Sequence, residues 1–175
     1  MAPHPIKLMI IRSYMKRFSI DHFIETGTNL GDTLGYFAKK GVHCASIELS
    51  QALYKGACAV FGQRRNVMLI FGDSSQELPA LLKNINKPAL FWLDGHYSCG
   101  ITARAAVQTP ISAELDAILA HAIKRHVILI DDARCFDGTN DYPHLDDLLR
   151  VIREDGRYVA EVSADIIRLV PRMAP

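Results

Sequence analysis

Phe23-Ile-Glu-Thr-Gly-Thr-Asn-Leu-Gly-Asp-Thr33 is the stretch that decides how this chain folds. It reads as a buried strand that ends at a carboxylate, turns on glycines and continues as a helix. Gly27 permits a close backbone approach, and Gly31 falls where the helix must pack against the sheet. The spacing Gly-x-x-x-Gly differs from the dinucleotide fingerprint Gly-x-Gly-x-x-Gly. By itself the turn is equally compatible with a nucleotide site and with glycines used only for packing.

The composition is that of one compact domain over residues 1–175. Hydrophobic residues make up 49% of the chain, which suffices for a sizeable core. The 20 Lys and Arg residues nearly balance 19 Asp and Glu, so we expect a small-molecule partner and no nucleic acid or membrane. The four cysteines form no Cys-x-x-Cys pair, and no apolar run approaches the roughly 20 residues of a membrane-spanning helix. These features predict a cytoplasmic protein with free thiols.

Strands alternate with helices along the chain. Apolar and basic residues over 6–18 predict an amphipathic helix, within an N-terminal segment 1–19, that lies across one edge of the sheet or supports a homo-oligomer. A core over 20–171 follows, with a mostly parallel sheet, helices on both faces and an antiparallel C-terminal hairpin. We expect strands at 22–25, 42–49, 67–71, 89–93, 127–130, 157–162 and 165–170. We expect helices at 32–40, 51–61, 110–124 and 143–154, and one more that contains 77–83 and is capped by Ser74 or Ser75.

Acidic residues stand at the ends of five successive predicted strands. Any one of them could cap a helix or face solvent. So many like charges on one edge, however, cost free energy unless cations or hydrogen-bond donors lie between them. Ligands bind at the carboxyl ends of parallel strands, so this edge is the predicted site. The residues are Glu25, Glu48, Asp73, Asp94 and the pair Asp131 and Asp132.

Two of these strand ends suit a nucleoside. Glu48 ends the strand beside the glycine turn, where a carboxylate can accept hydrogen bonds from both hydroxyls of a ribose. Asp73 with Ser74 can pair with the exocyclic amine and the ring edge of adenine. The pattern therefore favours a nucleoside ligand.

Asp94, Asp131 and Asp132 form a second group, on the fourth and fifth predicted strands. Their hard oxygen ligands suit magnesium, manganese or calcium and not zinc. A divalent ion there can bind two substrate oxygens and lower the pKa of a hydroxyl. His96 is the candidate base, because an imidazole accepts a proton near neutral pH. A loop histidine that only bonds the backbone is an equally good reading of His96.

Five motifs together resemble the class I S-adenosylmethionine-dependent methyltransferases. They are Glu25-Thr-Gly-Thr-Asn-Leu-Gly-Asp-Thr33, Ile47-Glu48, Gly72-Asp73-Ser74, Leu93-Asp94-Gly-His96-Tyr97 and Ile130-Asp131-Asp132. The resemblance is closest to the metal-dependent, catechol-type small-molecule O-methyltransferases and covers about residues 20–170. It implies a Rossmann-like methyltransferase fold whose seven-stranded sheet has the order 3-2-1-4-5-7-6, with the cofactor over the first four strands.

The same resemblance implies residue roles and S-adenosylmethionine as cofactor. Glu25 and Gly27 fall around its methionine and ribose part, Glu48 on the ribose hydroxyls, and Asp73 with Ser74 near the adenine. Asp94, Asp131 and Asp132 fall where that family holds its divalent cation. The full cofactor-binding set is Glu25, Thr26, Gly27, Thr28, Gly31, Thr33, Glu48, Leu49, Asp73, Ser74 and Asp94.

The chain departs from that family's pattern in two motifs. Asp132 stands where an asparagine is usual, and Tyr97, beside His96, stands where a lysine base is common. Three functions stay open: a metal-assisted O-methyltransferase, a metal-independent methyltransferase of the same fold, and a non-catalytic nucleoside-binding or scaffold protein. A nicotinamide enzyme is disfavoured by the glycine spacing.

Overall fold

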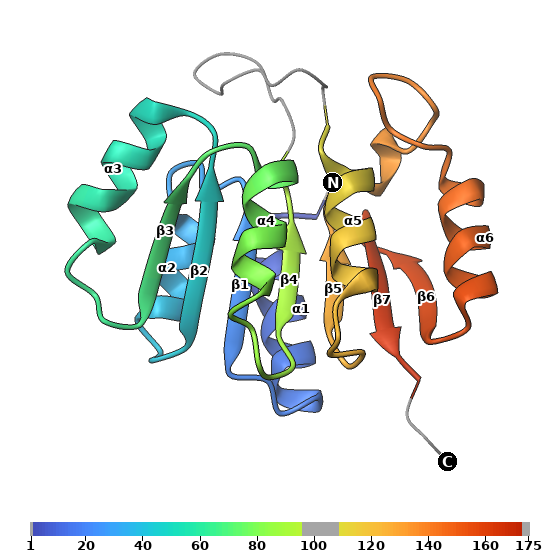
Figure 1. Ribbon diagram of the computed structural model, residues 1–175, viewed down its shortest axis with the longest axis horizontal. Helices are drawn as coiled ribbons and strands as arrows, with labels where there is room; N and C mark the ends of the chain where they lie inside the picture. Colours follow the sequence, from blue (N-terminus) through green and yellow to red (C-terminus); the bar gives the residue numbers. More distant parts are fainter. Residues whose placement is uncertain (1, 96–108, 173–175) are drawn as a thin grey trace.

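A seven-stranded sheet forms the middle layer of the protein, with strand order β3-β2-β1-β4-β5-β7-β6 (Figure 1). The computed structural model describes residues 2–95 and 109–172. Strands β1 to β5 are parallel, and β7 runs antiparallel to both β5 and β6. This confirms the predicted order and the C-terminal hairpin. The strands are β1 (His22–Thr26), β2 (His43–Glu48), β3 (Val67–Phe71), β4 (Leu90–Leu93), β5 (Val127–Ile130), β6 (Tyr158–Ser163) and β7 (Ile166–Pro171).

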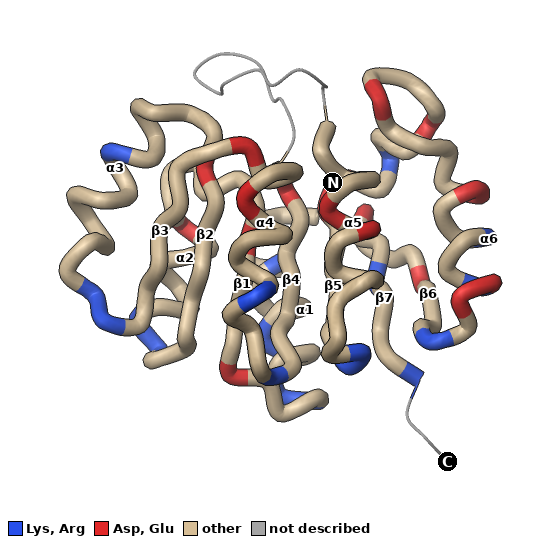
Figure 2. Tube along the Cα trace, in the orientation of Figure 1, with Lys and Arg blue, Asp and Glu red and all other residues tan. Residues whose placement is uncertain are grey.

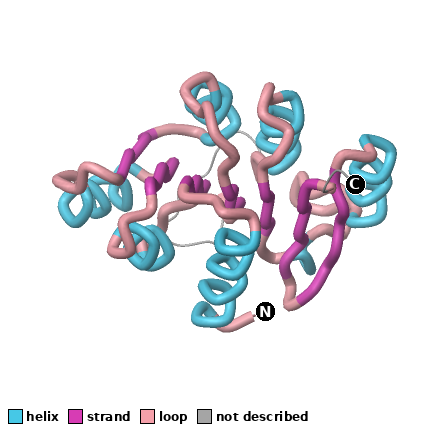
Figure 3. Tube along the Cα trace, turned by 90° about the horizontal axis from the view of Figure 1, so that it is seen from below, coloured by secondary structure: helices cyan, strands magenta, loops and turns pink. Residues whose placement is uncertain are grey.

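Helices cover both faces of the sheet (Figure 3). Buried residues of α1, α2 and α3 share one core cluster with Trp92, and those of α4, α5 and α6 share another with Phe91. Neighbouring residues of a strand point to opposite faces, so Phe91 and Trp92 belong to different cores. None of the helices in the described ranges is long and apolar enough to cross a membrane. The helices are α1 (His4–Arg17), α2 (Asp32–Ala38), α3 (Gln51–Phe61), α4 (Ser74–Leu82), α5 (Ile111–Ala120) and α6 (Leu145–Asp155).

The central strands β4 and β5 are apolar and buried along their whole length. Such continuous runs are typical of parallel strands covered on both faces. Thr26 pairs in register with Leu93, and Leu93 pairs with Ile130, so the three strands end level with one another. This register brings the residues that follow each strand to one edge.

Helix α1 lies on a face of the sheet, not across its edge as the sequence predicted. Ile11, Tyr14 and Met15 are buried, and the helix contacts β4 in the middle of the sheet. Trp92 and Leu129 would otherwise leave an apolar surface on that face, and α1 covers it. The apolar stripe of α1 is therefore used within the chain.

Helix α5 ends at Ala120, not at the predicted Lys124, because His121 leaves the helical conformation at ψ 148. His121 Nε2 bonds the carbonyl oxygen of Leu82 at 3.0 Å, and its Nδ1 bonds Nε2 of His126 at 2.8 Å. Nδ1 of His126 accepts from the amide of Ala89 at 3.1 Å. Burial, above other causes, lowers the pKa of His126 to about 4, so its ring is neutral. The two rings link α4, α5 and β4 at the amino ends of the strands.

Candidate functional site

The predicted acidic residues gather at the end of the sheet to which the parallel strands point, where Figure 2 shows most of the Asp and Glu positions. Glu25, Glu48, Asp131 and Asp132 are buried, and Asp94 is half-buried. Burying a carboxylate costs free energy unless a cation or hydrogen-bond donors compensate it. The partners of each carboxylate therefore indicate what the site can bind.

The glycine turn brings the end of β1 against the end of β4. Gly27 has φ 82, and a Cβ built on it would lie 2.5 Å from the carbonyl oxygen of Asp94. Gly31 has φ 79 at the start of α2, and a Cβ there would lie 2.6 Å from the ring of Phe61. Both positions exclude a side chain, for reasons of space and of backbone conformation. The turn at Gly27 leaves bare backbone at the centre of the edge.

Glu25 lies directly beneath this turn and is 1% exposed. Ser46 Oγ donates to its Oε1 at 2.8 Å, and Thr28 Oγ1 lies 2.6 Å from Ser46 Oγ. Burial, with repulsion from Asp94 and Glu48, raises the pKa of Glu25 to about 8. The charged groups that act on Glu25 are thus carboxylates, and a cationic ligand would stabilise its ionised form. Ser46 was missed by the sequence analysis, because a serine within a strand carries no signal of its own.

Glu48 holds the glycine turn to the start of α3. Its Oε2 accepts from the amide of Asn29 at 2.9 Å, and its Oε1 accepts from the amide of Ser50 at 2.8 Å. Each carboxylate oxygen has a second lone pair, so contacts to ribose hydroxyls stay chemically feasible. Leu49, the next residue, is half-buried. The ribose role of Glu48 stays a prediction.

Asp73 is the N-cap of α4, and its Oδ1 accepts from the amide of Ser75 at 2.9 Å. Ser74 is the first residue of the helix and is buried. Both residues lie at the end of β3, next to β2 in the sheet. An adenine contact by either residue stays a prediction, since capping already explains the presence of Asp73.

Glu114 on α5 is a buried acid that the sequence analysis missed. It is 1% exposed, and burial raises its pKa to about 7, partly opposed by the hydroxyls of Ser74 and Thr26. In the described part of the chain, Glu114 Oε1 and Thr26 Oγ1 make no hydrogen bond of good geometry. Such unsatisfied buried atoms can be paired by a ligand. The sequence does hold a signal that Glu114 is buried. Glu114 follows Ile111 by three residues and stands next to Leu115, so it falls in the apolar stripe of α5.

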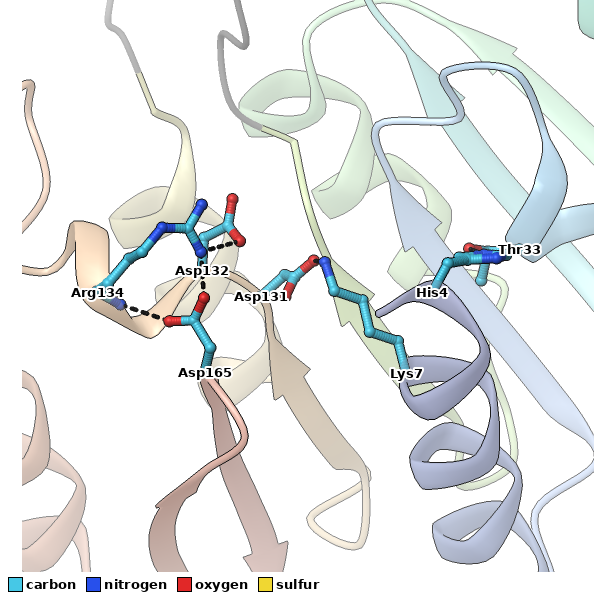
Figure 4. A network of polar contacts seen from close by, with 7 residues as sticks. All are labelled: His4, Lys7, Thr33, Asp131, Asp132, Arg134 and Asp165. Carbon is cyan, nitrogen blue, oxygen red and sulfur yellow. Dashed lines mark hydrogen bonds and ion pairs between the residues drawn. The ribbon is translucent and has the colours of Figure 1, made fainter. Parts of the chain in front are cut away.

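Two of the three carboxylates predicted to bind a metal, Asp131 and Asp132, are paired with cationic side chains of the protein (Figure 4). Lys7 Nζ of α1 forms an ion pair with Asp131 Oδ2. Arg134 lies in the short 3₁₀ helix Ala133–Cys135; its Nη1 lies 2.7 Å from Asp132 Oδ1 and also pairs with Asp165. Within residues 2–95 and 109–172 there is no group of three or more His, Cys, Asp or Glu side chains placed to hold a metal. This arrangement does not fit the predicted divalent cation.

Of two further predicted site residues, the structure places Thr33 but not His96. Thr33, in the first turn of α2, lies 3.1 Å from the Nε2 of His4 at the start of α1 (Figure 4). This contact brings the N-terminal helix to the same edge as the glycine turn. His96, the candidate base, lies outside the described residues.

The comparisons with known proteins find similar structures but no similar sequences. No protein-family model matches the chain, and no curated protein matches it. An O-methyltransferase from Bacillus cereus in complex with S-adenosylhomocysteine is 15% identical, with TM-score 0.67, over 96% of this chain and 82% of that one. An S-adenosylhomocysteine-bound methyltransferase from Podospora anserina is 16% identical, with TM-score 0.66, over 99% and 80% of the two chains. The 23S rRNA methyltransferase ErmE is 17% identical, with TM-score 0.61, over 99% and 70%.

These likenesses show the fold. The strand order, the antiparallel hairpin and the helices on both faces are those of the Rossmann-like methyltransferases. The fold class expected from the sequence motifs is confirmed.

Proposed function

We propose that this protein is an S-adenosylmethionine-dependent methyltransferase that methylates a hydroxyl group of a small molecule. The observation that carries the proposal is Glu25, a buried carboxyl group whose charged neighbours are carboxylates, set beneath the bare backbone of Gly27. A ligand that combines a nucleoside with positive charge suits this place. S-adenosylmethionine has both, and structural neighbours hold its demethylated product.

The residues of the chain contribute binding and orientation. Glu25 faces the cationic part of the cofactor, Glu48 the ribose hydroxyls, and Asp73 with Ser74 the adenine. When bound, the cofactor would supply a methyl group on a cationic sulfur. The sulfur would leave as a neutral thioether as the acceptor oxygen bonds to the methyl carbon, and the hydroxyl proton would pass to a base, for which His96 is the candidate. In-line displacement requires the acceptor to be held at a fixed angle and distance, and holding it there is what the edge of the sheet contributes.

The acceptor is proposed to be small and neutral or cationic. One structural neighbour is an rRNA methyltransferase, so the fold alone does not distinguish small molecules from nucleic acid. Acidic positions outnumber basic ones at this end of the sheet (Figure 2), and this excess disfavours a phosphate backbone. The divalent cation implied by the sequence resemblance forms no part of this proposal, because Asp131 and Asp132 are already paired with protein cations.

The test is binding of S-adenosylhomocysteine by isothermal titration calorimetry. We expect one site per chain, and at least tenfold weaker binding in Gly27→Ala, because the new Cβ meets the Asp94 carbonyl. Gly56→Ala is the matched control, since a Cβ at Gly56 meets no atom within 4 Å. Glu25→Gln keeps the shape of the side chain and should weaken S-adenosylmethionine more than its neutral-sulfur product.

Methyl transfer is measured with labelled S-adenosylmethionine on a panel of alcohols, phenols and diols. Label in an acceptor supports the enzyme, whereas binding without transfer to any acceptor favours the non-catalytic reading. Absence of S-adenosylhomocysteine binding by the folded wild-type protein would overturn the whole proposal.

A further inference from the structure

The stripe of α1 that faces the sheet continues as far as the proposed site. Lys7, Ile11 and Met15 are four residues apart, so they lie on one side of the helix. Ile11 and Met15 are buried against the sheet, and Lys7 projects from the same side at the edge where β5 ends (Figure 4). The contact between His4 and Thr33 holds the first turn of α1 at this edge. Packing thus fixes where the Lys7 ammonium group lies.

Only one of the two carboxylate oxygens of Asp131 contacts Lys7. Its side chain is 1% exposed, and Oδ2 forms the ion pair with Lys7 Nζ, whose side chain is 14% exposed. Oδ1 is buried, with no hydrogen-bond partner in the described part of the chain. Asp131 also lines a small cavity of about 10 Å³ together with Gly95, Glu114 and Tyr142. A buried acceptor atom without a donor is a place where a ligand can donate a hydrogen bond.

We propose that Lys7 is a positioning residue that supplies, from within the chain, the positive charge expected of a divalent cation. The acceptor hydroxyl donates to Asp131 Oδ1, and the Lys7 ammonium group, which has three donors, holds the acceptor oxygen. This inference rests on the proposed function. A metal ion entering the site would have to displace Lys7 from Asp131 and Arg134 from Asp132.

The inference specifies how the acceptor is recognised. A divalent metal can bind two neighbouring oxygens of one substrate at once, whereas an ammonium group directs single hydrogen bonds to an oxygen. An acceptor with one hydroxyl should therefore be methylated as well as a diol of the same size. A marked preference for vicinal diols would contradict the inference.

The experiment compares Lys7→Met with Lys16→Met, an exposed lysine on the same helix. Mn²⁺ binding, followed by electron paramagnetic resonance at millimolar metal with S-adenosylhomocysteine present, should show no saturable site in the wild type. Lys7→Met should lower the melting temperature by roughly 5–15 °C because it leaves Asp131 buried and unpaired. Adding Asp131→Asn to Lys7→Met should restore most of the lost melting temperature. Lys16→Met should change the melting temperature little.

Methyl transfer to the acceptor panel separates positioning from stability. Below the melting temperature of each variant, we expect transfer to fall by about tenfold or more in Lys7→Met, to be partly restored in Lys7→Arg, and to be unchanged by a chelator. Stoichiometric Mn²⁺ binding that Asp131→Asn abolishes would overturn the inference, as would a Lys7→Met variant as stable and active as Lys16→Met. The proposed function fails separately, by loss of S-adenosylhomocysteine binding in the wild type.

Discussion

Glu25 and Glu114 bind a proton more tightly in the folded chain than in the unfolded chain. Burial raises the pKa of Glu25 to about 8 and that of Glu114 to about 7, from 4.5 for an ordinary glutamate. Because the folded state holds the extra protons, the stability they contribute is fully present below pH 4.5. It is lost as the pH rises through 7 for Glu114 and 8 for Glu25.

Glu114→Gln should remove part of this pH dependence. The wild type is expected to lose on the order of 3 kcal/mol of unfolding free energy through Glu114 between about pH 5 and pH 8. The variant, whose amide does not ionise, should keep that amount. Urea unfolding at the two pH values measures the difference, with Glu154→Gln on the exposed side of α6 as the control. Equal pH slopes for Glu114→Gln and the wild type would contradict the assignment.

Single residues at the strand ends could be predicted from the sequence, whereas their partners could not. Glu25 and Glu48 follow buried apolar stretches, so their place at the edge is readable from the order of residues. Lys7 reads as one of several basic residues on an amphipathic helix, and only the packing of α1 on β4 brings it to Asp131. The sequence predicted these aspartates as metal ligands, and it gave no sign that Lys7 and Arg134 would lie against Asp131 and Asp132.

The bounds of a helix or strand could be predicted where the local pattern of apolar residues determines them. Strands β4 and β5 are continuous apolar runs, and the structure places them within one residue of the predicted bounds. The end of α5 depends instead on His121, whose ring is held by Leu82 and His126. Helical periodicity carries no information about such a contact, so the helix was predicted too long.

His126→Phe tests this link between elements. The substitution removes the acceptor for the Ala89 amide and the partner of His121 Nδ1, and leaves both groups without that bond. We expect the unfolding free energy to fall by about 2–4 kcal/mol, because each unsatisfied buried group costs about 1–3 kcal/mol. His43→Phe, at an exposed position at the start of β2, should cost far less in the same urea titration. Similar losses in both variants would show that the imidazole link is not what stabilises the α4 and α5 ends.

At the scale of the whole molecule, the charges are separated along the direction of the parallel strands (Figure 2). The net charge of +1 gives no information about this separation, because acidic and basic residues nearly balance over the whole chain. Helices that return from each strand start at the carboxyl edge and end at the opposite edge, so acidic residues at the first and basic residues at the second complement the helix dipoles. A hollow of about 610 Å³ at the amino ends of the strands is lined by Arg12, Lys16, Lys40 and Lys87, with Asp21.

This separation predicts where a nucleic acid would touch the protein. A single-stranded oligonucleotide should bind only weakly, at the basic amino ends of the strands, with an affinity that falls steeply with salt. Fluorescence anisotropy should show weaker oligonucleotide binding in the double variant Lys40→Glu with Lys87→Glu, while calorimetry gives an unchanged affinity for S-adenosylhomocysteine. Saturating oligonucleotide should likewise leave that affinity unchanged, because the two ligands bind opposite ends of the sheet. Competition between them would place a polyanion at the acidic edge and make RNA the better candidate for the methyl acceptor.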